Sequence, residues 1–336
     1  MDIAIIGAGA IGGLVGARLA LAGERVTMMV RGTSLVAIRQ HGLTLVERDG
    51  HERRVTAIAA SDDYAGTGPQ DLVILAVKAQ QVAAVAGRLH HLFGPETAVV
   101  TMQNGIPFWY FQGQAGPHAE RRVASVDPDG SVAATIPVAR VIGSVVYPAA
   151  VLEAPGRIRH IEGDRFPLGE PDGSSSARVL AASACFQHAG LKAPVLDDIR
   201  AEIWLKLWGN LTFNPISALA HATLVDICDY PLARRLAACM MLEAQTVAGK
   251  LGITFRVGLD KRIDGAAKIG KHKTSMLQDV EAGRDSEIDA LVGAVIELAR
   301  LTDTPTPHID TVYALVKLLN HGMVDGGNYV RMQKLA

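Results

Sequence analysis

The chain is short of cysteine, of aromatic residues and of excess charge. Its three cysteines, Cys185, Cys228 and Cys239, have neither C-x-x-C spacing nor an even count, so we expect no disulfide framework and no metal site. The formal net charge is only −1 and the basic residues are scattered. A surface of this kind is not expected to bind nucleic acid or an anionic membrane.

Long uninterrupted hydrophobic runs are also absent. The start of the chain is apolar, but Asp2 follows Met1 directly and Arg18 interrupts the run, which argues against a signal peptide or a membrane span. The chain has 336 residues, 49% of them hydrophobic, which is enough to form a large core in about two domains. We expect a cytoplasmic globular protein with reduced cysteines.

A glycine-rich loop lies near the start of the chain. Residues 3–6 predict a buried parallel strand, a helical pattern runs to residue 21, and residues 25–30 predict a second strand. The loop between the first strand and the helix predicts a dinucleotide site, because its glycines allow a tight turn, approach of a pyrophosphate and close helix packing. The predicted cofactor contacts are Gly7, Ala8, Gly9, Ala10, Ile11 and Gly12.

The end of the second predicted strand favours NADP(H) over NAD(H). An acidic residue there would accept hydrogen bonds from the ribose 2′-hydroxyl of NAD, but this chain has Arg31, followed by Thr33 and Ser34. A guanidinium can bind a 2′-phosphate through two hydrogen bonds. The alternative is an ordinary surface arginine after a strand. We expect NADPH as the cofactor.

Two further parallel strands are predicted at residues 72–77, ending at Lys78, and at residues 98–101, followed by Asn104. Ligands of open α/β sheets bind beyond the carboxyl ends of the strands, so both side chains are candidates to contact the nicotinamide ribose or the substrate. Alternatively, Lys78 is a solvated charge and Asn104 belongs to a simple turn. Antiparallel strands at 138–168 are expected to extend the sheet, with a helix at 175–189 and a last strand at 192–196 closing the domain.

Strand signals end near residue 197, and helical periodicity dominates from there on. We therefore predict an α/β domain at 1–197 and an all-helical domain at 198–336.

In the first helix of the second domain, polar side chains recur at four-residue spacing. Lys206, Asn210 and Asn214 therefore lie on one stripe of an otherwise apolar helix. The stripe could simply face solvent, and Pro215 should bend this helix.

Residues 273–289 predict a short helix that ends at Gly283 and a second helix capped by Ser286. Glu287 would lie in the first turn of the second helix, where the helix dipole favours a carboxylate. That placement is also what an ordinary N-terminal charge would show, and Ser275 could be a plain helix residue.

Together these motifs resemble the ketopantoate reductase (2-dehydropantoate 2-reductase) family. The resemblance rests on GAGAIGG from Gly7, Arg31, Lys78, QNG from Gln103, KLWGNLTFNPISAL from Lys206 and SMLQDVEAGRDSEID from Ser275. It implies a Rossmann-type domain with an extended sheet, an all-α C-terminal domain and an active site between them. It further implies that Lys206 is the proton donor, that Asn210, Asn214 and Ser275 hold the substrate, and that Glu287 lies where cofactor and substrate meet.

The reaction implied is the reduction of a 2-oxo acid by NADPH, with 2-dehydropantoate reduced to (R)-pantoate in pantothenate biosynthesis. Burial would lower the pKa of Lys206, and Glu287 would either orient a substrate hydroxyl or raise that pKa. Asn104 could serve both cofactor and substrate.

Two departures from the family pattern leave the substrate open. The segment 106–130 is longer and rich in aromatics, and Thr223-Leu224 stand where a further substrate asparagine is common in the family. The alternatives are a reductase of the same architecture for a different 2-oxo or hydroxy acid, or a non-catalytic NADP(H)-binding sensor. The Leu/Ala-rich helical half could also bury a homodimer face.

Overall fold

The computed structural model describes residues 1–333. Its internal contacts form two compact units: residues 1–103, 107–122 and 127–199 make the first, and residues 104–106, 123–126 and those from 200 onward make the second. Within the described part of the chain, no helix combines the length and apolarity needed to cross a bilayer.

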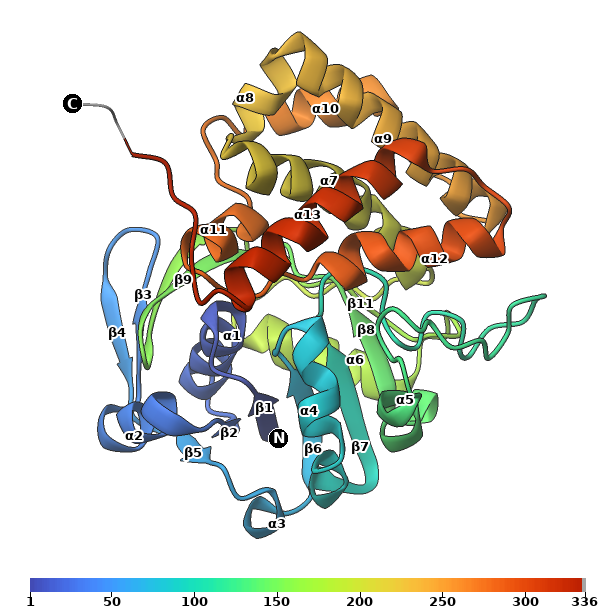
Figure 1. Cartoon of the computed structure of the whole chain (residues 1–336). Coiled ribbons are helices and arrows are strands. Elements are labelled where there is room, and N and C mark those ends of the chain that lie inside the picture. Colours follow the sequence, from blue (N-terminus) through green and yellow to red (C-terminus); the bar gives the residue numbers. More distant parts are fainter. Residues whose placement is uncertain (334–336) are drawn as a thin grey trace. The chain divides into compact units, whose positions relative to one another are not determined.

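The first unit is built on a seven-stranded sheet with the order β11-β8-β7-β6-β1-β2-β5 (Figure 1). All neighbouring strands run parallel except β11, which is antiparallel to β8. The strands are β1 (Asp2–Ile6), β2 (Arg25–Met29), β5 (Ala59–Ser61), β6 (Gln70–Leu75), β7 (Phe93–Thr101), β8 (Val141–Ser144) and β11 (Leu168–Gly169). The central strands are buried almost throughout, which explains why they are apolar at nearly every position.

A second sheet of four strands has the order β4-β3-β10-β9. Its strands are β3 (Leu43–Val46), β4 (Glu52–Val55), β9 (Ala149–Ala154) and β10 (Arg157–Glu162). The expectation that antiparallel strands at 138–168 extend the main sheet is therefore only partly right. β8 joins the sheet but runs parallel to β7, and β11 joins it antiparallel from Leu168, whereas β9 and β10 pair with each other and with β3. Residue alternation predicts a strand but not its partner, and β3 lies about a hundred residues earlier.

Helix α1 (Ala10–Leu21) contacts strands of both sheets and also helix α6 (Ala177–His188). Gly13 lets α1 approach β10, since a Cβ on this residue would stand 2.5 Å from Ile158. Helix α6 confirms the helix expected at 175–189, and the Ser176 hydroxyl accepts from the Val179 amide at its N-terminus. The remaining short helices of this unit are α2 (Gly32–His41), α3 (Tyr64–Thr67), α4 (Val82–Ala86), α5 (Ser131–Thr135) and the 3₁₀ turns η1 (Ala79–Gln81), η2 (Leu89–Leu92) and η3 (Val138–Arg140).

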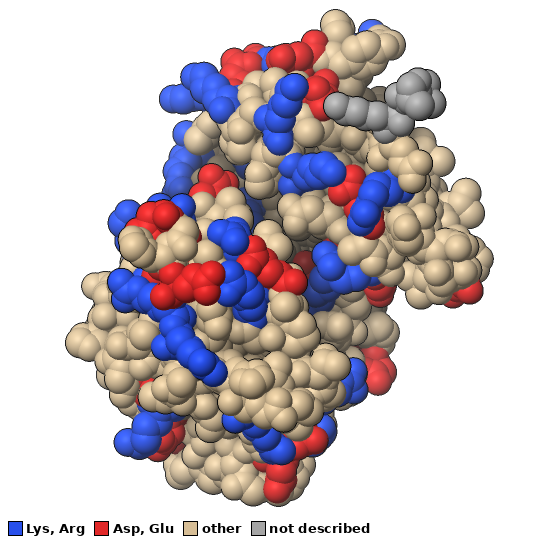
Figure 2. Space-filling view, turned by 90° about the vertical axis from the view of Figure 1, so that its left-hand side faces the viewer, with Lys and Arg blue, Asp and Glu red and all other residues tan. Residues whose placement is uncertain are grey.

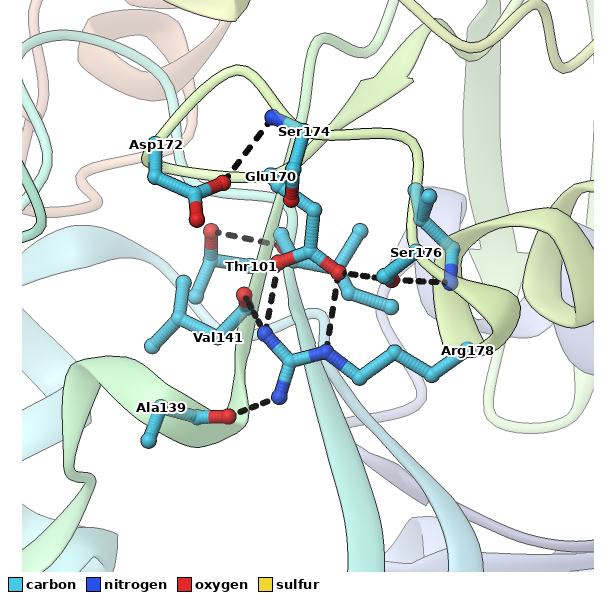
Figure 3. Close-up of polar contacts among 10 residues, drawn as sticks. Thr101, Ala139, Val141, Glu170, Asp172, Ser174, Ser176 and Arg178 are labelled. Carbon is cyan, nitrogen blue, oxygen red and sulfur yellow. Dashed lines mark hydrogen bonds and ion pairs between the residues drawn. The ribbon is translucent and has the colours of Figure 1, made fainter.

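The strand expected at 192–196 is wrong. These residues form only two isolated bridges, from Lys192 to Arg165 and from Val195 to Leu168. Next to the β8–β11 pair, Arg178 of α6 forms an ion pair with the buried carboxylate of Glu170, which directly follows β11 (Figure 3). The same guanidinium donates to the carbonyl oxygens of Ala139 and Val141, so it ties helix α6 to the strand end.

In the second unit every regular element described is helical, as expected. The helices are α7 (Ile199–Ala220), α8 (Leu224–Asp229), α9 (Pro231–Lys250), α10 (Leu259–Lys268), α11 (Ser275–Glu281), the π turn η4 (Asp289–Gly293), α12 (Ala294–Leu301) and α13 (Pro307–Val324). Trp204 and Trp208 of α7 are fully buried, and Trp208 stacks on Phe255. Pro215 lies inside α7.

The helix expected after Ser286 differs in its first turn. Helical residues begin at Ile288, so Glu287 lies just before the helix rather than in its first turn, and its carbonyl accepts from the Leu291 amide. The turn that follows is a π turn, which sequence periodicity does not reveal because one extra residue shifts the pattern.

On the face drawn in Figure 2, acidic and basic side chains are interspersed, in keeping with the balanced composition.

Candidate active site

The glycine loop has the geometry of a phosphate-binding turn. Gly7 has a φ of +102°, which favours glycine, and its amide donates to the Met29 carbonyl of β2. A Cβ on Gly12 would stand 2.1 Å from the Gly7 carbonyl oxygen, so only glycine fits there. By contrast, apart from the residue itself and its two chain neighbours, no atom of the described residues lies within 4 Å of a Cβ built on Gly9, and this residue is exposed.

The amino end of α1 faces this open position. Its first turn, Ala10, Ile11, Gly12 and Gly13, contains no acidic side chain, and Gly9 caps the helix without a side-chain hydrogen bond. The amides of the first turn and the positive end of the helix dipole therefore suit a pyrophosphate. Ala8 lies buried beneath the turn.

Arg31 follows β2 at the start of α2. It occupies the cap position of this helix in extended conformation, and its side chain is exposed. The first residues of α2 are Gly32, Thr33 and Ser34, so the backbone amides of the helix N-terminus directly follow Arg31 in the chain. A cation beside a helix N-terminus is a suitable site for a 2′-phosphate.

Lys78 does not stand at a strand end as expected. Strand β6 ends at Leu75, and Lys78 caps the turn η1, where its amide donates to the Gln81 side chain. The ends of β6 and β7 are joined by Gln103, whose amide donates to the carbonyl oxygens of Leu75 and Val77, each at 2.9 Å. The strand prediction ran two residues too far because Ala76 and Val77 continue the apolar run.

The polar stripe of α7 belongs to the second unit. Lys206 and Asn210 are partly buried, and Asn214 is 6% exposed although it carries a carboxamide. The Asn214 Nδ2 lies 3.4 Å from the Ser275 hydroxyl oxygen, so α7 and the start of α11 meet through two predicted substrate residues. Thr274 caps α11 by accepting from the Leu277 amide, which fixes the position of Ser275.

Asn104 connects Lys206 with Glu287. Its Oδ1 accepts from the Lys206 ammonium at 2.5 Å, and its Nδ2 donates to the Glu287 carboxylate at 3.2 Å. Lys206, Asn104 and Glu287 thus form one hydrogen-bonded chain from three separate segments. The sequence indicated each residue singly, but it gave no sign that a carboxamide bridges the lysine and the glutamate.

The environment of Lys206 changes its acidity. Burial lowers the pKa of this ammonium from 10.5 to about 8, and the Glu287 charge acts in the opposite direction. Desolvation therefore prevails over the attraction of the carboxylate, which answers a question that the sequence left open. An ammonium with a pKa of about 8 is mostly protonated at neutral pH and is a far better acid than a solvated lysine.

The Asn104 segment is held by backbone contacts that sequence analysis missed. The Ile106 amide donates to the Ala290 carbonyl oxygen of the π turn at 3.0 Å. Gly105 has a φ of +90°, and a Cβ on it would stand 2.2 Å from the same oxygen. The only sequence signal was the Asn-Gly pair, which predicts a turn but not its partner.

Segment 106–130 is divided between the units: residues 107–122 and 127–130 belong to the first, and residues 106 and 123–126 belong to the helical one. Within that unit, the Glu297 carboxylate of α12 accepts from the amides of Ala124 and Ser125, both at 2.8 Å, and from the Ser125 hydroxyl at 2.6 Å. These bonds attach residues 124 and 125 of the segment to helix α12. Trp109 and Phe111, from its aromatic part, are buried.

Comparison with known protein families gives matches over most of the chain. The family model for ketopantoate reductase PanE/ApbA matches residues 3–173, and the model for the C-terminal part of the same family matches residues 198–320. A 2-dehydropantoate 2-reductase of Mesorhizobium japonicum is 53% identical over 322 residues, which cover 95% of this chain and 98% of that protein. A 2-dehydropantoate 2-reductase of Halobacterium salinarum is 30% identical over 320 residues, with 95% and 98% covered.

Solved structures of the same fold cover the chain equally well. A structure from Ralstonia solanacearum, provisionally assigned as a ketopantoate reductase, superposes with a TM-score of 0.92 at 41% identity, covering 98% of this chain and 99% of that one. A ternary structure of D-mandelate dehydrogenase with NADH and anilino(oxo)acetate gives a TM-score of 0.81 at 23% identity, with 96% and 99% covered. At that identity the likeness concerns the fold alone.

Proposed function

This chain belongs to the ketopantoate reductase family, and from that premise we propose that it is an NADPH-dependent oxidoreductase that reduces 2-dehydropantoate to (R)-pantoate. The observation that carries the proposal is the Lys206–Asn104–Glu287 chain, in which a lysine of pKa about 8 is held by a carboxamide. A non-catalytic sensor would have no use for such a proton donor.

We propose that the cofactor is held by the first unit. Gly7, Gly9 and Gly12 with the amino end of α1 would bind the pyrophosphate, and Arg31 with the start of α2 would bind the 2′-phosphate. These residues fit the group, because the position above Gly9 is open and the first turn of α1 lacks acidic side chains. When bound, NADPH supplies the hydride for the ketone carbon. Ala8, Ala10, Ile11 and Lys78 are the remaining proposed contacts.

Lys206 is the proposed general acid. Negative charge develops on the carbonyl oxygen of a 2-oxo acid during reduction, and the ammonium would stabilise that charge and then deliver a proton to the oxygen. Asn104 fixes the ammonium from one side, so Lys206 needs little reorganisation during the reaction. Glu287, hydrogen-bonded to Asn104, would complete the polar environment of the ammonium.

The substrate would be bound by uncharged donors on α7 and α11. Asn210 and Asn214 can donate to substrate oxygens, and the Ser275 hydroxyl can bind a carboxylate without the desolvation cost of a further buried charge. The contact between Asn214 and Ser275 supports one shared binding surface for these two residues. Thr223-Leu224 stand where the family often has an asparagine, and Leu224 is buried and apolar, so a different 2-oxo acid is the alternative substrate.

The decisive experiment is a substrate panel. The purified protein is mixed with NADPH and, separately, with 2-dehydropantoate, 2-oxoisovalerate and an aryl 2-oxo acid, and the loss of NADPH absorbance is followed. Highest kcat/KM with 2-dehydropantoate supports the proposal. Preference for another acid would identify a reductase of the same architecture with a different substrate, and no turnover with tight NADPH binding would favour a sensor.

Three further parts of the proposal concern the whole molecule. We propose residues 1–197 as the cofactor domain and 198–336 as the substrate domain. We also propose a cytoplasmic location, in keeping with three cysteines that are all free. A homodimer through the helical half is supported by apolar side chains exposed on α9 and α13, among them Leu242, Leu315 and Leu318, and light scattering of the purified protein would test it.

A further inference from the structure

The π turn Asp289–Gly293 sets how Glu287 and Ala290 are oriented. Such a turn holds one residue more than an α turn, and π turns are rare within helices. Rewinding it to an α turn would rotate the residues before it by about 100° relative to α12. The direction of the Glu287 side chain and of the Ala290 carbonyl therefore depends on this turn.

Both of these groups hold the Asn104 segment. Glu287 accepts from the Asn104 side chain at 3.2 Å, and the Ala290 carbonyl accepts from the Ile106 amide at 3.0 Å. Gly105 packs so closely on the Ala290 carbonyl that no side chain could be added between them. The Asn104 segment is thus held by one bond to Glu287, two residues before the turn, and by one bond from Ile106 to the turn itself. Asn104 in turn accepts from the Lys206 ammonium.

The π turn is itself tied to α13 through Asp289. The Tyr313 hydroxyl donates to Asp289 Oδ1 at 2.6 Å, and the Lys317 ammonium lies 3.2 and 3.1 Å from the two carboxylate oxygens. Gly293, at the other end of the turn, leaves space for this contact, since a Cβ there would stand 3.2 Å from the Tyr313 hydroxyl. Burial and the bond to Asp289 raise the pKa of Tyr313, so its hydroxyl remains a donor at neutral pH.

We propose that Asp289, Tyr313 and Lys317 form a positioning cluster that holds the π turn in its register and thereby holds Asn104 against Lys206. None of the three is placed among the groups that touch substrate or cofactor. Their effect on catalysis passes through the turn, Asn104 and then Lys206. The kinetic part of this inference rests on the proposed function, whereas the structural part does not.

The test is Tyr313→Phe, which removes one hydroxyl and leaves the ring in place. Without the bond to Asp289 the turn loses its register, Asn104 withdraws from the ammonium, and the charged form of Lys206 loses an acceptor. The pKa of Lys206, followed by NMR of ¹³C-labelled lysine and assigned with Lys206→Met, should then fall by roughly half a unit to one unit. The kcat should drop roughly tenfold to a hundredfold, with the Kd for NADPH unchanged.

Tyr230→Phe is the matched control, because Tyr230 is 60% exposed at the start of α9, and it should change neither quantity. If Tyr313→Phe does not fold, the same two measurements are made on Lys317→Gln, because the Lys317 side chain is 46% exposed and the substitution keeps most of its length. An unchanged Lys206 pKa in a folded variant overturns the proposal. If the wild-type protein reduces no 2-oxo acid but the Lys206 pKa shifts as described, the proposed function fails and the positioning cluster stands.

Discussion

Replacing Lys206 by methionine should stabilise the protein at neutral pH while it removes activity. The pKa of Lys206 falls from 10.5 to about 8 on folding, and each pH unit of this difference corresponds to about 1.4 kcal/mol, so keeping the buried ammonium charged costs about 3 kcal/mol. Methionine has a similar length and no charge. Removing the lysine also leaves Asn104 Oδ1 without its donor, which costs about 1 kcal/mol.

The expected net gain in the free energy of unfolding is therefore about 2 kcal/mol at pH 7. The gain must depend on pH in a defined direction. Below pH 8 both folded and unfolded wild-type protein carry the proton and the full cost is present. Between pH 8 and 10.5 the unfolded state binds more protons than the folded one, so wild-type stability rises with pH and the advantage of the variant disappears.

Equilibrium unfolding in urea, followed by tryptophan fluorescence, measures this difference. Trp204 and Trp208 lie on the same helix as Lys206 and are fully buried, so their emission reports on the helical unit. Lys261→Met, at an exposed position on α10, is the control and should change stability little at either pH. A variant no more stable than wild type at pH 7, or a gap that does not change with pH, would refute the reasoning about Lys206.

Three further predictions concern the cofactor and the pH optimum. The kcat should fall as pH rises through about 8, because deprotonation of Lys206 removes the acid; a profile flat to pH 10 would speak against this role. Arg31→Ala should lower the preference for NADPH over NADH by roughly 10- to 100-fold in kcat/KM, and an unaltered ratio would mean that Arg31 does not contact the 2′-phosphate. Gly12→Ala should destabilise the fold by about 1–3 kcal/mol, since its Cβ would stand 2.1 Å from the Gly7 carbonyl oxygen. Gly9→Ala should leave the melting temperature unchanged but weaken NADPH binding measured by calorimetry. The reverse pattern would contradict the loop geometry.

The sequence predicted the parts of the fold that depend on local patterns. The βαβ unit around the glycine loop, helix α6 and the helical second half all follow from periodicity, glycine placement and capping residues. The partners of β9 and β10 could not be predicted in this way, because strand pairing with β3 depends on contacts between distant segments. Strand β3 itself, four residues long between helix α2 and a turn, carries too short a pattern to be recognised.

The candidate site shows the same limit. Spacing on α7 placed Lys206, Asn210 and Asn214 on one stripe, and the structure brings Asn214 to Ser275 as a consequence. What spacing could not supply is the role of Asn104 as a bridge, because this depends on a loop that follows β7 but contacts the π turn of the helical unit. The extra residue of that turn also leaves no mark on the apolar pattern of the sequence, because Leu291, Val292 and Val295 are apolar and all buried.

The most direct test of the account is a single-turnover measurement on wild type and Lys206→Ala. Each protein, saturated with NADPH, is mixed rapidly with 2-dehydropantoate, and NADPH oxidation is followed by stopped-flow absorbance. We predict that the variant oxidises NADPH roughly 10²–10⁴ times more slowly while its Kd for NADPH is unchanged. Equal rates in the two proteins would contradict the assignment of Lys206 as the proton donor.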